Sequence, residues 1–146
     1  MKKIIAVTLL VLALAGAFVV TGCQNVKSPL VDRPWVLTSW SGTDGILHDA
    51  LPGASVTATF DSKTGQVTGS GGVNSYGGAF HVDHLNVTVT QLIHTEMAST
   101  NPALNEQENS FFKALQAAQT FSVGHDTLTI KGGGWELNFT LQTATP

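Results

Sequence analysis

Apolar and polar residues alternate at every second position through much of this chain, and the alternation is clearest in residues 56–60, 85–90 and 135–142. A period of two places all apolar side chains on one face of an extended strand. Strands with one buried and one wet face are typical of antiparallel sheets. Residues 34–40, 121–123 and 128–130 are expected to form further strands, so the pattern predicts a mainly β domain.

Turn residues and glycines predict how these strands are joined and bent. Residues 61–65 and 132–134 carry turn signals. Gly69, Gly71, Gly72, Gly77 and Gly78 crowd one segment. Because glycine inside a strand usually marks a bulge or a sharp bend, we expect a strongly coiled sheet, as a small antiparallel β-barrel requires.

One segment breaks the period of two and predicts a single α-helix that closes one end of the barrel. Asn101 is a good N-cap residue, and Pro102 suits the first helical position. Apolar residues then recur at helical spacing until Ala118, where the helix is expected to end. The face of the helix that is expected to be exposed to solvent consists of Glu106, Gln107, Asn109, Lys113 and Gln116.

The first 23 residues have the pattern of an export signal. Lys2 and Lys3 precede an uncharged apolar run from Ile4 to Val20, and Thr21-Gly22-Cys23 closes it. A transmembrane helix is the alternative, but 17 apolar residues are at the low end of the length that a span needs. No basic cluster follows the run, which favours cleavage.

The stretch Val20-Thr21-Gly22-Cys23 resembles the lipobox of bacterial lipoproteins. The resemblance implies diacylglycerol on the sulfur of Cys23, cleavage after Gly22 and an acylated new N-terminus. The alternative is an ordinary secretory signal that contains a cysteine. Since the only cysteine lies where lipidation needs it, we expect a lipoprotein signal peptide over 1–22, a lipidated Cys23 with a flexible tether over 23–33, and one folded domain over 34–146.

The charge of the chain bears on its partners. The net charge is −3, and without residues 1–22 the chain has five basic and ten acidic residues, a net charge of −5. This balance argues against a nucleic-acid binder, and it makes the lipid anchor the expected contact with a membrane. Gln24 follows the lipidated cysteine where inner-membrane lipoproteins usually have Asp. By that resemblance we expect the protein on the outer membrane of the cell envelope, facing the periplasm, where the source is Gram-negative. We also expect a monomer.

Four ordered motifs resemble the META/HslJ-like domain, and they span about residues 34–141. The family's F-D, turn and G-x-x-G-C-N-x-Y-x-G are matched by Phe60-Asp61, Gly65 and residues 69–78. Residues 95–99 resemble T-x-M-A-C, residues 108–115 resemble E-x-x-F-x-x-x-L, and Trp35 opens a W-x-L motif.

The resemblance implies a bacterial envelope protein without enzyme activity, in a family that is often lipidated and whose members include some linked to heat shock or novobiocin resistance. Its fold resembles that of secretin pilot lipoproteins, which escort an outer-membrane subunit. Val73 and Ser99 stand where relatives often have cysteines. If those cysteines are disulfide partners, the Cα atoms of Val73 and Ser99 should lie about 4.4–6.8 Å apart.

No catalytic, metal or cofactor motif is complete in this chain. Asn74 and Tyr76 form a candidate binding patch in the glycine-rich bend, with a structural role as the alternative. His81, Asp83 and His84 are close in sequence, but on a strand the two histidines point to opposite faces. We therefore expect no catalytic residue, no metal and no cofactor.

Three functional hypotheses follow from the sequence. The first is a non-enzymatic, stress-related lipoprotein that binds an envelope protein through an exposed apolar groove. The second is a pilot-like chaperone whose groove accepts a peptide or a lipid chain. The third is a metal-dependent enzyme, which needs His81 to cluster with a second histidine and a carboxylate.

Overall fold

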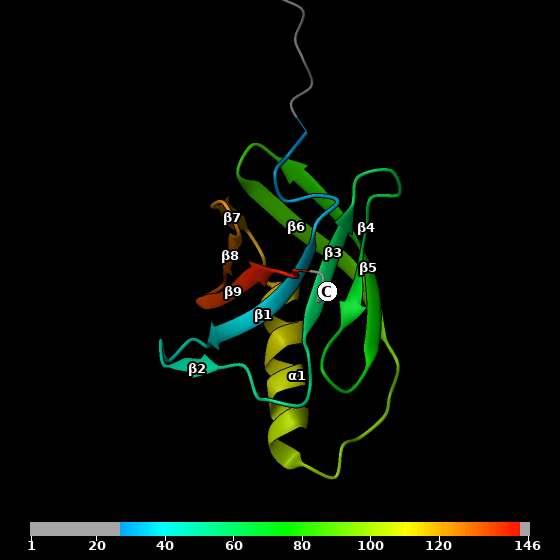
Figure 1. The fold of residues 1–146 in the computed structure, drawn as a ribbon, viewed down its shortest axis with the longest axis vertical. Helices are drawn as coiled ribbons and strands as arrows, with labels where there is room; N and C mark the ends of the chain where they lie inside the picture. The colour runs from blue at the N-terminus through cyan, green and yellow to red at the C-terminus, as the bar shows by residue number, and fades with distance from the viewer. Residues whose placement is uncertain (1–26, 144–146) are drawn as a thin grey trace, which may run out of the picture.

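The structure is a computed structural model that describes residues 27–143, and Figure 1 shows the path of the chain. In this part of the chain one helix and nine strands follow one another. They are β1 (Pro34–Ser41), β2 (Leu47–Asp49), β3 (Thr57–Asp61), β4 (Gln66–Ser70), β5 (Ser75–Asp83), β6 (Asn86–His94), α1 (Pro102–Gln116), β7 (Thr120–Val123), β8 (Thr127–Gly132) and β9 (Trp135–Leu141).

All strand pairs are antiparallel, and the sheet closes in a ring. The order is β2-β1-β3-β4-β5-β6-β7-β8-β9, and β1 also pairs with β9. The short β2 pairs with β1 beyond the point where β3 leaves it. The weakest junction is between β6 and β7, where the register holds a single pair, Asn86 with Thr120. The expected closed antiparallel architecture is confirmed.

The period of two in the sequence corresponds to one buried face on each strand. Ala58 and Phe60 on β3 are fully buried, and on β9 Leu137 and Phe139 are buried in the same alternating way. These side chains point into the ring and meet Trp35 of β1. The apolar faces predicted from the sequence therefore form the single core of the described domain.

Helix α1 begins and packs as the sequence predicts. The side chain of Asn101 accepts a hydrogen bond from the backbone N–H of Ala103, and Pro102 is the first helical residue. Phe111 packs against Tyr76 and Phe139, which fixes the helix at one end of the ring (Figure 1). The sequence predicted that Gln107 is exposed to solvent, and this prediction is wrong. The residue is buried, and its side-chain oxygen accepts a hydrogen bond from the backbone N–H of Leu51, at 2.7 Å.

In the glycine-rich segment, the lack of side chains allows close contacts with neighbouring elements as well as bends of the backbone. A Cβ atom on Gly69 would lie 2.1 Å from the carbonyl oxygen of Thr57, which is closer than any side chain permits. A Cβ atom on Gly71 would lie 2.7 Å from a carboxylate oxygen of Glu108 on α1. Gly69 therefore lets the end of β4 lie against Thr57 of β3, and Gly71 lets the β4–β5 connection lie against α1.

Residues 28–33 belong to the folded body, so the expectation of a flexible tether is wrong for them. Leu30 is fully buried, and its carbonyl oxygen accepts a hydrogen bond from the indole of Trp35. The backbone N–H of Asp32 donates to Phe60 at 2.8 Å. The sequence did not predict this packing, because Leu30 and Val31 form an isolated apolar pair without strand or helix periodicity.

The predicted signal peptide over 1–22, Cys23 and the first tether residues lie outside the described residues. Within residues 27–143, no helix is long and apolar enough to cross a membrane.

Candidate functional site

The side chain of Asn74 uses all of its hydrogen-bonding capacity inside the protein. Its oxygen accepts from the hydroxyl of Thr95 and from the backbone N–H of Met97, at 2.8 and 2.7 Å. Its amide nitrogen donates to the carbonyl oxygen of Met97 and to the carboxylate of Glu108. Asn74 is 3% exposed. It therefore ties the β4–β5 connection to the segment between β6 and α1.

Glu108 completes this network from the helix. One carboxylate oxygen accepts from the backbone N–H groups of Val73 and Asn74, at 2.9 and 2.6 Å, and the other accepts from the Asn74 amide. The residue is 5% exposed. Charge-assisted bonds of this kind are stronger than bonds between neutral groups. The carboxylate is thus held by three N–H donors, and it fixes α1 to the glycine-rich bend.

Tyr76 is a packing residue with an anchored hydroxyl. Its ring meets Phe111 and Phe112 edge-on, with centroids 5.4 and 5.5 Å apart. The hydroxyl donates to the carbonyl oxygen of Thr57 at 2.8 Å, and burial raises the pKa of that hydroxyl above its usual range. Asn74 has no polar group left for a ligand. This geometry supports the structural interpretation of the two residues over a binding patch.

Val73 and Ser99 both contact α1. The backbone N–H of Val73 donates to Glu108, and that of Ser99 donates to the side chain of Asn105, three residues earlier in the same helix. Positions three apart lie on one helix face. This arrangement is compatible with the expected proximity of Val73 and Ser99, and the Cα distance itself stays a prediction.

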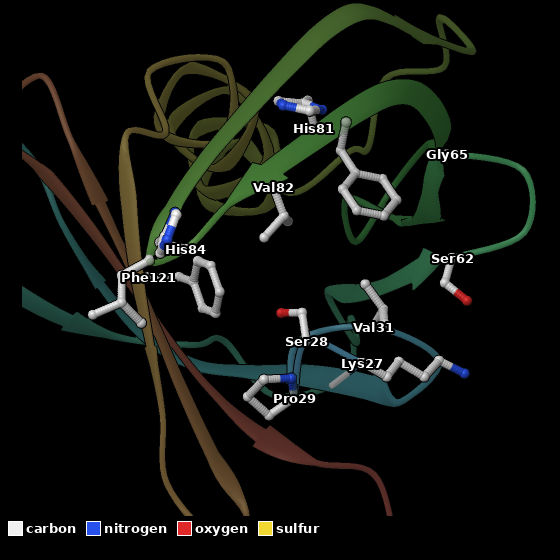
Figure 2. Close-up of a pocket in the computed structure, with 12 residues that line it drawn as sticks. Lys27, Ser28, Pro29, Val31, Ser62, Gly65, His81, Val82, His84 and Phe121 are labelled. Carbon is white, nitrogen blue, oxygen red and sulfur yellow. The ribbon is translucent and has the colours of Figure 1, made fainter. Parts of the chain in front are cut away.

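The histidines do not assemble a metal site in the described part of the chain. His84 pairs with its neighbour Asp83 at 2.7 Å and has a φ of 55°, at the turn between β5 and β6. Figure 2 shows the rings of His81 and His84 well apart, with Val82 between them. Among residues 27–143, no three His, Cys, Asp or Glu side chains gather in a way that could hold a metal ion.

A groove with a volume of about 600 Å³ is lined by the residues drawn in Figure 2. The N-terminal segment and the β5–β6 turn, which border it, lie at the end of the ring away from α1 in Figure 1. This volume is within the range of ligand pockets. The groove is bounded by the N-terminal segment, the β3–β4 turn, the end of β5 and the start of β7. Its apolar walls are formed by Pro29, Val31, Phe80, Val82, Leu85 and Phe121.

Polar groups stand at the rim of this groove. Lys27 and Ser28 border it on one side and His81 on the other. Sequence reasoning missed the groove because four separate segments build it. The one local signal was the apolar pair Phe80 and Val82, which alternates with His81.

The family model of the META domain matches residues 28–144. The chain belongs to the META domain family. The match begins at the residue where the folded body begins, six residues before β1. No curated protein matches this chain.

Three solved structures have similar folds. An NMR structure of a protein from Burkholderia xenovorans is 26% identical, with a TM-score of 0.65, and the alignment covers 78% of this chain and 84% of that one. A second NMR structure is 23% identical, with a TM-score of 0.60 and coverages of 77% and 91%. A crystal structure of a DUF4847 family protein from Bacteroides vulgatus is 16% identical, with a TM-score of 0.53 and coverages of 77% and 94%. The last two support the fold alone.

Proposed function

We propose that this META domain protein is a bacterial envelope lipoprotein that acts as a stress-related, non-enzymatic binding module. The observation that carries the proposal is the groove at the end of the ring that bears the N-terminal segment. Its walls are mostly apolar, and its volume suits an extended apolar segment. Membership of the META family supports a binding role.

The lipid anchor rests on residues 20–23, where a lipobox-like sequence ends at the single cysteine. Lys27, four residues later, lines the groove. A partner held in the groove would thus stay close to the anchored membrane. This arrangement suits a protein that receives or escorts an envelope component.

The pilot-like alternative is a special case of the same proposal. A chaperone for an outer-membrane protein needs an apolar groove that accepts one segment of its client, and Phe80, Val82 and Phe121 offer such a surface. The metal-dependent alternative is weaker, since within residues 27–143 His81 lacks the second histidine and the carboxylate that it requires.

Metabolic labelling tests the anchor. Cells that express the full chain are grown with a tritiated or alkyne-bearing palmitate, and the immunoprecipitated protein is compared with a Cys23→Ala variant. We expect label on the wild-type chain and none on the variant. If the two chains are labelled equally, or if neither chain is labelled, lipidation of Cys23 is contradicted.

Photocrosslinking in living cells tests the binding module. A benzophenone amino acid replaces His81 at the rim of the groove, and a matched variant carries it at Leu47 on β2. Both positions are exposed strand residues. We expect one recurrent envelope protein to be captured from position 81, and not from position 47 or from the Cys23→Ala background. The same products from both positions would contradict a specific groove.

A further inference from the structure

We propose that the groove end of the ring docks on the bilayer that carries the lipid anchor, with Leu85 inserted among the lipid head groups. This inference rests on the lipidation of Cys23 proposed above. It adds an orientation and a contact surface, which lipidation alone does not supply.

The first argument is that the chain enters the body at a fixed point. The carboxylate of Asp32 accepts hydrogen bonds from the backbone N–H and the hydroxyl of Ser62, at 2.9 and 2.6 Å. It also pairs with the ammonium group of Lys27. With Leu30 buried two residues earlier, the segment from Ser28 onward cannot swing away from the ring.

The second argument is the short reach of the remaining chain. Cys23 lies four residues before Lys27. Four extended residues span at most about 14 Å. A domain of about 120 residues has a radius of gyration of about 13–14 Å and is therefore more than about 27 Å across, so the link is shorter than the width of the body that it holds. The end of the ring that carries Lys27 therefore stays next to the head groups.

The third argument is an exposed leucine at the same end. Leu85 sits in the turn between β5 and β6 and is 65% exposed. It lines the same groove as Lys27. Figure 1 shows this turn beside the N-terminal segment, on the side away from α1. An apolar side chain that projects beside a short membrane link gains by leaving water for lipid.

The fourth argument is charge. Two of the carboxylates near this end pair with strongly basic side chains, Asp32 with Lys27 and Asp126 with Arg33. Asp49 lies on β2, Glu96 lies between β6 and α1, and Glu106 lies on α1, all away from the groove. We therefore expect anionic lipid to repel this end less than the end that carries Glu96 and Glu106.

A lipid-quenching experiment tests the docking. The lipidated full chain is prepared as Leu85→Cys and as Leu47→Cys, and the new thiol carries an environment-sensitive fluorophore, since the sulfur of Cys23 is blocked by its lipid. Both chains are placed in vesicles of phosphatidylethanolamine and phosphatidylglycerol that contain spin-labelled lipid. We expect quenching at position 85 to be about threefold stronger than at position 47, because interfacial groups sit within the head-group region.

Equal quenching at the two positions, on chains that float with the vesicles, would overturn the docking and leave the lipoprotein intact. Capture of a protein in cells by the same benzophenone amino acid at position 85, together with equal quenching in vesicles, would assign this end to a protein partner and also overturn it. A chain that does not float, and whose Cys23 is unmodified by mass spectrometry, would refute the lipidation and the docking together.

Discussion

At the scale of single residues, Glu108 is expected to contribute to the stability of the fold. Its carboxylate accepts three N–H bonds from Val73 and Asn74 in a buried site. Glu108→Gln keeps the shape but turns one accepting oxygen into a donor that faces an N–H group. Hydrogen bonds to charged groups contribute about 1.5–3 kcal/mol, so we expect a loss of that order in the free energy of unfolding. Urea denaturation measures it.

The matched control for this prediction is Glu106→Gln, two residues earlier on the exposed side of the same helix. Surface substitutions of this kind usually change stability by less than about 0.5 kcal/mol. If the two variants unfold at the same urea concentration, the network around Asn74 does not hold the helix as inferred.

The stability of the folded protein is expected to depend on pH through the carboxyl group of Asp32. Hydrogen bonds from Lys27 and then Ser62 hold the pKa of its carboxyl well below the usual range in the folded state. The stabilisation is therefore complete above the ordinary carboxyl pKa, about 4, and is lost as the pH falls through the folded value. We expect Asp32→Asn to lower the urea midpoint at neutral pH and to differ less from wild type in acid. If the difference in urea midpoint between wild type and Asp32→Asn stays constant with pH, the hydrogen bonds of Asp32 are not its cause. The same conclusion follows if Asp49→Asn shows an equal difference.

At the scale of elements, Val73 and Ser99 test how the loop before α1 is held. In a Cys23→Ala background, Val73→Cys with Ser99→Cys should form a disulfide on oxidation, because both positions contact one face of α1. A loop of this length predicts a gain of about 3–4 kcal/mol over the reduced form. The urea midpoints of the two forms measure the gain. If the disulfide forms only after the protein is unfolded, the two positions are not neighbours in the folded state.

Alternation predicted most of the strands, and the exceptions have physical reasons. The residues of β2 are all exposed, so that strand has no buried face to produce a pattern. In β4 and β5, Gly69, Gly77 and Gly78 replace the side chains that alternation needs. Helix α1 was predicted because its cap and its apolar face are both local features of the sequence.

The candidate sites were less predictable because they join distant segments. The sequence identified Asn74 and Glu108 as motif residues, but not the hydrogen bond between two side chains that are 34 positions apart. The groove needs Val31, Phe80 and Phe121, which come from three separate segments. No short window of sequence contains that information.

At the scale of the whole molecule, the two ends of the ring differ in character. The end near α1 is closed by the buried network of Asn74 and Glu108, whose polar groups satisfy one another. The opposite end keeps an apolar groove and the exposed Leu85. The motif residues Asn74 and Glu108 thus hold the helix end together, and the groove lies outside their network. This division agrees with the binding module proposed above.

The boundary of the domain gives the last prediction. Residues 28–33 contribute Leu30 and Val31 to the core, which are 0% and 8% exposed. Burying a leucine or a valine contributes about 1.5–3 kcal/mol each. A chain that begins at Pro34 should therefore unfold with about 3 kcal/mol less free energy than one that begins at Ser28. Urea denaturation of both chains measures the difference. Equal stability would return these residues to the role of a tether and would remove the fixed entry point on which docking at the membrane depends.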